Sequence, residues 1–179
     1  MLLKQAVEAD YGEVVELANV AYRKTGDGAS WNSETGIISG VRTTVEALRE
    51  DVAAKPEARL MLWRDEGSGE LLGTVWLEPK SAGTWYLGLL MVRPGLQNRG
   101  LGRELLGVAE GYVLTHGGRC VRMTVLNVRA GLIAWYERRG YVLTGETEAF
   151  PYGDERFGTP LRDDLFFVVM EKTVSVQEG

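Results

Sequence analysis

The stretch most suited to chemistry is a glycine-bearing turn between an apolar run and a helical pattern. The apolar run covers residues 85–92, and Pro94 and Gly95 interrupt it. Apolar residues then recur three or four positions apart from Leu101 to Tyr112, which indicates a helix. The first amides of a helix lack partners within it, so a helix start attracts anions. The turn is therefore expected to bind a phosphate group.

The glycines and arginines of this turn have separate physical reasons to be there. Gly100 and Gly102 lack a side chain, so the main chain can take unusual dihedral angles and a phosphate oxygen can approach the amides. Arg99 and Arg103 add positive charge beside them. A plain strand-to-helix connection is the alternative, because glycine is the commonest turn residue. A Walker-type loop does not fit, since no Gly-Lys-Ser or Gly-Lys-Thr follows, and the dinucleotide fingerprint lacks its three-glycine spacing.

The turn resembles the signature of the GNAT family of N-acetyltransferases. The family pattern Gln/Arg-x-x-Gly-x-Gly/Ala is matched in order by Gln97, Asn98, Arg99, Gly100, Leu101 and Gly102. The resemblance implies that this turn, together with Arg103, holds the pyrophosphate of acetyl-CoA. The strand that ends in Leu90, Met91 and Val92 is similar to the family's fourth strand, whose splayed end pairs with the pantetheine arm and presents an amide to the thioester carbonyl.

Transfer of an acetyl group to an amine also needs a donor for the carbonyl oxygen and an acid for the departing sulfur. The amides of Met91 and Val92 suit the first role, because fixed main-chain donors stabilise a developing oxyanion without reorganising. Tyr136 is the candidate acid. A tyrosine titrates near ~10 and a thiol near ~8.5, so a tyrosine keeps its proton at neutral pH and can still give it to a nascent thiolate. A half-buried structural tyrosine is the alternative.

A second motif supports the resemblance further along the chain. The family pattern of an Asn, a small residue, a Tyr and then Gly-Phe or Gly-Tyr is matched by Asn127, Ala130, Tyr136, Gly140 and Tyr141. It implies that Asn127 contacts pantetheine. The segment from Asn127 to Tyr136 is two residues longer than the commonest family spacing, so this contact is expected to be less direct.

The base that accepts the amine proton is not assigned from the sequence. Residues 85–92 contain no carboxylate, although the family often has a glutamate there. Glu78 and Glu34 remain as candidates, each expected as a solvated surface charge, and a water molecule bound to main-chain carbonyls would also serve. Trp31 shares a long loop with Glu34 and suits either a segment over the substrate or a simple anchor for the loop.

The elements around these residues predict an α/β fold. Three consecutive antiparallel strands lead into the glycine turn, and the resemblance implies a GNAT-like acyl-CoA N-acyltransferase fold, with a mostly antiparallel mixed sheet flanked by helices in one domain, 1–179. Residues 24–41 and 149–162 have no clean period and are expected to be irregular. Periodicity predicts helices at 8–23, 43–54, 100–114 and 130–139, and strands at 2–7, 59–65, 71–78, 85–92, 119–126, 141–144 and 165–172.

Composition restricts the partners and the compartment. The 179 residues carry a net charge of −5, which disfavours a general grip on nucleic acid. The N-terminus has no long apolar stretch, so neither a signal peptide nor a membrane span is expected. Cys120 is the only cysteine, which points to a reducing, cytoplasmic compartment, and it is expected to be a packed thiol. His116 is the only histidine and is expected to cap a helix or face solvent, so no metal site is predicted.

The resemblance implies an enzyme that transfers an acetyl group from acetyl-CoA to the primary amine of a small molecule or an exposed peptide amine, by direct attack in a ternary complex. A non-catalytic acyl-CoA sensor on the same fold is the alternative, supported by the missing strand carboxylate, and a nucleotide-binding module of another class is a third. The two irregular segments would line the acceptor side, so the acceptor itself is not predicted. The apolar residues 165–170 could form the edge of a homodimer.

Overall fold

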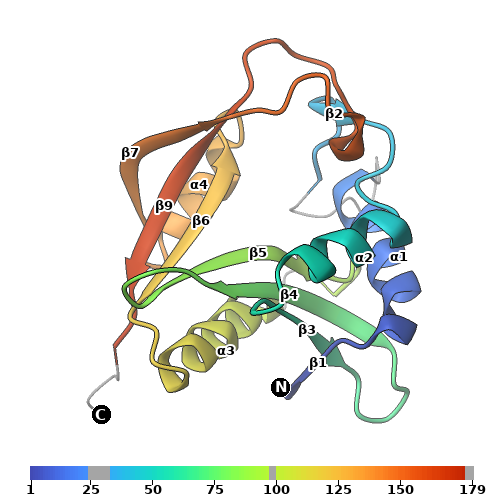
Figure 1. The fold of residues 1–179 in the computed structure, drawn as a ribbon, viewed down its shortest axis with the longest axis vertical. Coiled ribbons are helices and arrows are strands. Elements are labelled where there is room, and N and C mark those ends of the chain that lie inside the picture. The colour runs from blue at the N-terminus through green and yellow to red at the C-terminus, as the bar shows by residue number, and fades with distance from the viewer. Residues whose placement is uncertain (24–32, 97–99, 176–179) are drawn as a thin grey trace.

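The computed structural model describes residues 1–23, 33–96 and 100–175, and its main feature is a seven-stranded sheet in the order β1-β3-β4-β5-β6-β9-β7 (Figure 1). A second, two-stranded sheet contains β2 (Ile38–Ser39) and β8 (Thr159–Pro160). The strands of the large sheet are β1 (Leu3–Gln5), β3 (Arg59–Arg64), β4 (Leu71–Pro79), β5 (Thr84–Val92), β6 (Cys120–Leu126), β7 (Val142–Ala149) and β9 (Phe166–Thr173). The helices are α1 (Tyr11–Arg23), α2 (Val45–Ala54), α3 (Leu101–Thr115) and α4 (Ala130–Glu137), with 3-10 turns η1 (Glu8–Asp10) and η2 (Glu155–Phe157).

The large sheet is mixed and mostly antiparallel, as predicted. Every neighbouring pair is antiparallel except β5 and β6. Helices cover both faces, because successive side chains of a strand point to opposite sides. Leu60 and Leu62 of β3 pack with α1 and α2, while Met61 packs in the cluster that contains the buried face of α3. The expected fold class is confirmed.

The parallel pair at the centre of the sheet is short. β5 and β6 pair only at Thr84–Cys120, Trp85–Val121 and Tyr86–Arg122, after which β5 stays on β4 and β6 pairs with β9. Leu89 has a positive φ of 45°, and the register of β4 and β5 shifts in the same region. Such a bulge bends a strand and increases its twist. The sheet is thereby divided into two halves that separate beyond Tyr86.

The two segments without a clean sequence period meet in space. Ile38 pairs with Pro160 and Ser39 with Thr159, and the amide of Leu161 donates to the carbonyl oxygen of Ile37 at 2.8 Å. The connection from β7 to β9 reaches across the open end of the sheet to lie beside β2, near α1 (Figure 1). The prediction of irregular structure therefore missed a small sheet, because its strands have two residues each and lie more than a hundred positions apart.

Several predicted bounds need small corrections. Residues 8–10 form a 3-10 turn before α1, α4 ends at Glu137, and β7 extends to Ala149. Trp31, Gln97, Asn98 and Arg99 lie outside the described residues. None of the helices in the described ranges is long and apolar enough to cross a membrane.

Candidate active site

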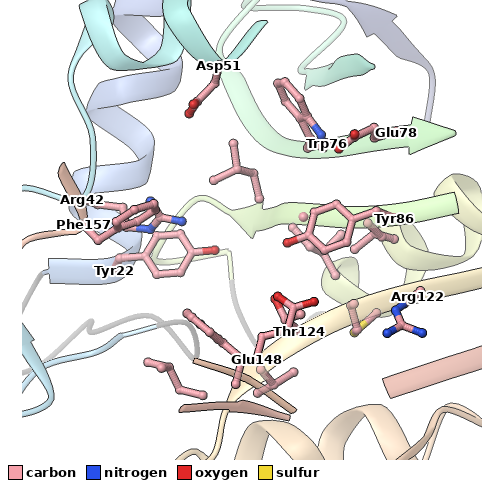
Figure 2. Close-up of a pocket in the computed structure, with 18 of the residues that line it drawn as sticks. Tyr22, Arg42, Asp51, Trp76, Glu78, Tyr86, Arg122, Thr124, Glu148 and Phe157 are labelled. Carbon is pink, nitrogen blue, oxygen red and sulfur yellow. The ribbon is translucent and has the colours of Figure 1, made fainter. Parts of the chain in front are cut away.

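A cavity of about 780 Å³ opens where the two halves of the sheet separate (Figure 2). One wall comes from α1, α2, β4 and β5, and the other from β6, β7 and β9, with α4 at the base. The lining mixes aromatic, hydroxyl and charged side chains. A cavity of this size with a few convergent polar groups is typical of a small-molecule site.

Tyr136 reaches this cavity from α4. Its side chain is only 6% exposed, and edge-on contacts with Trp135 and Tyr141 fix the ring at centroid separations of 5.0 and 5.5 Å. Its hydroxyl group has no hydrogen bond to any residue in the described ranges. Burial raises the pKa of Tyr136 well above its ordinary value, and the neighbouring Tyr22 raises it further. Tyr136 therefore keeps its proton at neutral pH and has it available for a ligand.

Two further tyrosines, which the sequence did not single out, face the same cavity. Figure 2 shows the hydroxyl groups of Tyr22, from α1, and Tyr86, from β5, pointing toward one another across it. Burial raises the pKa of Tyr22, and the positive charge of Arg42 only partly opposes this effect. The signal for Tyr22 was its place next to Ala21, at the end of the apolar stripe of α1. Nothing in the sequence indicated that it faces Tyr86.

The end of β5 presents its main chain to the gap between the sheet halves. Leu90 lines the cavity, and Leu90, Met91 and Val92 are each at most 3% exposed. The amide of Arg93 donates to the carbonyl oxygen of Leu72 on β4 at 2.7 Å. Hydrogen-bonded and non-hydrogen-bonded pairs alternate along antiparallel strands. The amide of Met91 is therefore directed to β4, and the amide of Val92 to the edge of β5 that faces away from β4.

The start of α3 provides main-chain donors at the predicted turn. Gly100 is the N-cap residue and has the left-handed φ of 75° that the turn requires. Glu104 is the first helix residue whose amide bonds back, to the Gly100 carbonyl oxygen at 3.0 Å. Within the described residues, the amides of Leu101, Gly102 and Arg103 have no main-chain acceptor, as expected for the first turn of a helix and as anion binding requires.

Arginines add positive charge near this helix start. Arg103 is exposed, and burial together with the charges of Arg138 and Arg103 lowers the pKa of Arg139. The Arg139 guanidinium group stacks on Trp135 at 3.5 Å from the ring centroid, and its Nε atom is buried without a hydrogen-bond partner in the described part of the chain. Arg103 and Arg139 form no ion pair within the described residues, and arginines in this setting beside a helix start fit a phosphate-bearing ligand.

Asn127 is engaged by the protein itself. Its side-chain amide donates to the carbonyl oxygen of Asp164 at 3.0 Å and accepts from the amide of Phe166 at 3.0 Å. These two bonds join the end of β6 to the start of β9. They use one N–H group and one lone pair of the side-chain amide, so the contact of Asn127 with pantetheine stays a prediction.

Glu34 and Glu78, the two candidate bases, are buried. The prediction that each is a solvated surface charge is wrong. Glu34 and Glu78 line the cavity and are each 8% exposed. Glu34 pairs with Arg23, and Glu78 pairs with Lys55 at 3.0 Å and Lys80 at 2.5 Å. Burial alone would raise the pKa of Glu78, but the hydrogen bonds from the two ammonium groups outweigh it and lower the pKa. A carboxylate held in this way is a poor proton acceptor.

The remaining sequence candidates have structural roles. Burial raises the pKa of the Cys120 thiol, as expected for a packed side chain and not for a nucleophile. His116 is the C-cap residue of α3, and its ring stacks on Tyr112 at 3.9 Å. Among the described residues, no cluster of histidine, cysteine, aspartate or glutamate side chains could hold a metal ion.

Solved structures of acetyltransferases share this divided mixed sheet. Ribosomal-protein-alanine N-acetyltransferase from Brucella melitensis has a TM-score of 0.67 at 17% identity, covering 97% of this chain and 100% of that one. A GNAT acetyltransferase from Elizabethkingia anophelis with acetyl-CoA bound has a TM-score of 0.57 at 16% identity, covering 70% and 83%.

Sequence comparison identifies the family. The model of the acetyltransferase (GNAT) family matches residues 27–141, and the chain belongs to this family. Mycothiol acetyltransferase from Beutenbergia cavernae is 37% identical over 83 residues, which make up 45% of this chain and 28% of that protein. The match thus spans less than a third of the relative's length.

Proposed function

We propose that the protein is an acetyl-CoA-dependent N-acetyltransferase that acetylates the primary amine of a small molecule or an exposed peptide amine. The observation that carries the proposal is the position of Tyr136: a buried residue with a protonated hydroxyl group lines the cavity at the point where β5 leaves β6. Family membership and the helix start at Gly100 support the same function. By their names, the structural neighbours include acetyltransferases of protein and polyamine amines, so the fold accommodates both kinds of acceptor.

The residues present fit acetyl-CoA. We propose that the amides of Leu101, Gly102 and Arg103 and the Arg103 guanidinium group bind the pyrophosphate, and that the open edge of β5 binds the pantetheine arm. Acetyl-CoA, when bound, supplies an acetyl group activated as a thioester. Of the two amides predicted for the carbonyl oxygen, we assign this role to Val92, because the Met91 amide is directed to β4.

The proposed reaction is a direct transfer in a ternary complex. The amine nitrogen bonds to the acetyl carbon as the carbon–sulfur bond breaks, the nitrogen loses one proton and the sulfur gains one. Tyr136 donates the proton to the sulfur, and its raised pKa keeps the hydroxyl group protonated up to alkaline pH. Because Glu34 and Glu78 already form ion pairs, we propose that a water molecule in the cavity accepts the amine proton.

The test is Tyr136→Phe, assayed for acetyl transfer over a panel of amines and for CoA binding by calorimetry. Loss of a general acid is expected to lower kcat by about a hundredfold or more while CoA affinity stays within a factor of two. Tyr112→Phe is the control and should match the parent, because this tyrosine of α3 stacks on His116 and is not among the residues that line the cavity.

The main alternative is a non-catalytic acyl-CoA sensor, which the absence of an available carboxylate on β5 and the pairing of Glu34 and Glu78 favour. A sensor would bind CoA tightly and consume no acetyl-CoA with any amine. The proposed activity is refuted if the parent protein binds acetyl-CoA but shows no turnover across polyamines, amino acids, aminoglycosides and peptide N-termini.

A further inference from the structure

The charged side chains of the cavity divide into a paired and an unpaired set. The paired groups neutralise one another: Glu78 with Lys55 and Lys80, Glu171 with Arg122, and Glu34 with Arg23. Arg42, Asp51 and Glu148 also line the cavity and form no ion pair or side-chain hydrogen bond within the described part of the chain. Charges of both signs are therefore available to a ligand in one cavity.

Arg42 is the unpaired cation. Its guanidinium carbon lies 5.0 Å from the centre of the Tyr22 ring, and Figure 2 shows it beside Tyr22 on the α1 side of the cavity. The main-chain amide of Arg42 donates to the side chain of Asn19 at 2.5 Å, which fixes the position of the residue. Arg129 also lines this cavity, and its charge, like that of Arg42, acts to lower the pKa of Tyr22. A guanidinium group held by a ring and its own main chain is well placed to bind an oxyanion.

Glu148 is an unpaired anion on the opposite wall. It projects from β7 in the row Leu126–Phe167–Glu148, whose members pair in register across β6, β9 and β7 and all line the cavity. Asp51 adds a second carboxylate from α2. Figure 2 shows Glu148 directed toward the space between Tyr22 and Tyr86. An ammonium group in this space would be stabilised by the carboxylate and by the tyrosine rings.

We infer that the acceptor is an amine that also carries a carboxylate or a similar oxyanion, as an α-amino acid does, with its acid group on Arg42 and its amino group on the side of Glu148. This inference rests on the proposed function, because it names the acceptor of that same site. Trp76, Phe150 and Phe157 line the same cavity and favour an acceptor with an apolar side chain. The acid group of the acceptor would thus neutralise Arg42, and its amino group would lie near the carboxylate of Glu148.

The experiment compares matched acceptors that differ only in the acid group: L-phenylalanine, its amide, phenethylamine and the corresponding aminophosphonate, followed by the same set with L-leucine derivatives. For the parent protein, kcat/KM for the amino acid is expected to exceed that of the amide and the decarboxylated amine by at least tenfold. The aminophosphonate arm shows whether the Arg42 site accepts any oxyanion or a carboxylate alone.

Arg42→Gln should lower kcat/KM for the amino acid by at least tenfold, to about the value for the amide, so that the preference for the acid is lost. Arg49→Gln, in which a surface arginine paired with Glu8 is replaced, is the control and should keep the preference. Glu148→Gln should raise KM for the amino acid and the amide alike. A thermal melt with CoA confirms that each variant is folded. Equal kcat/KM for acid and amide in the parent, or a preference that survives Arg42→Gln, would overturn the inference.

Binding separates failure of this inference from failure of the proposed function. Calorimetric titration of CoA-loaded protein with L-phenylalanine and with its amide is run beside the kinetics. Tighter, Arg42-dependent binding of the acid without turnover would support the acceptor class and refute the transferase. Turnover of amines without a preference for the acid would support the transferase and refute the inferred acceptor class.

Discussion

The guanidinium group of Arg23, in the last turn of α1, donates a hydrogen bond of 3.0 Å to the carbonyl oxygen of Phe157, 134 residues further along the chain. The same side chain donates to the carbonyl oxygen of Gly40 at 2.9 Å and pairs with Glu34. One residue therefore joins α1 to both segments that form the small β2·β8 sheet. Glu34 and Phe157, which this side chain contacts, both line the cavity.

Replacing Arg23 by Met is expected to destabilise the protein by about 3 kcal/mol, because it leaves the Glu34 carboxylate buried without a partner. The free energy of unfolding is measured by urea denaturation. In the double variant Arg23→Met/Glu34→Gln the buried charge is absent, so part of the loss should be recovered. A double variant no more stable than Arg23→Met alone would show that the lost hydrogen bonds to Gly40 and Phe157 dominate.

Gly158→Ala is expected to disrupt the pairing of β2 with β8. A Cβ atom at this position would lie 2.4 Å from the carbonyl oxygen of Ser39 and 2.9 Å from the Ile38 side chain, in addition to the strain of a φ of 88°. Gly153→Ala is the matched control, since its φ is 84° but a Cβ atom would meet nothing within 4 Å. The control should cost about 1 kcal/mol and Gly158→Ala clearly more, as measured by thermal unfolding. An equal loss of stability in the two variants would mean that the pairing of β2 with β8 contributes no measurable stability.

Glu78 makes a contribution to stability that depends on pH. Its pKa is lower in the folded protein than its ordinary value of 4.5, so its charged form is favoured by folding. The contribution is fully present above that ordinary value and is lost as the pH falls through it toward the folded-state pKa. Urea denaturation at pH 7 and at pH 3.5 should show a smaller drop in stability for Glu78→Gln than for the parent. An identical drop in both proteins would show that Lys55 and Lys80 do not stabilise the carboxylate.

Arg103→Gln is expected to weaken CoA binding by about tenfold while kcat at saturating acetyl-CoA stays unchanged. The reason is that Arg103 would contact phosphate and not the reacting atoms, and a charge-assisted bond of this kind contributes about 1.5 kcal/mol or more. Calorimetric titration with CoA measures the affinity, with Arg49→Gln as the surface control. If Arg103 contacts a phosphate, the affinity for CoA should fall more steeply with salt concentration in the parent than in Arg103→Gln. An unchanged Kd in the variant would contradict the assignment.

The sequence was most informative where the physics is local. The start of α3 follows from Gly100, Leu101 and the spacing of apolar residues, because an N-cap glycine and an amphipathic stripe act within a few positions. The strands β3, β4 and β5 follow in the same way, since neighbours in sequence pair through short turns. The place of Tyr136 on α4 follows from the same kind of local pattern. The mixed sheet was implied by the family resemblance, and the parallel pairing of β5 with β6 was not predicted.

The tertiary structure decided what depends on segments far apart in the chain. Glu34 and Glu78, expected as surface charges, are buried in ion pairs, and the Asn127 side chain bonds to the main chain of Asp164 and Phe166. Tyr22, Arg42 and Glu148 come from different elements, and no local pattern shows that they share a cavity. Local periodicity fixes elements and faces, whereas long-range packing alone determines which charges are compensated and which are left for a substrate.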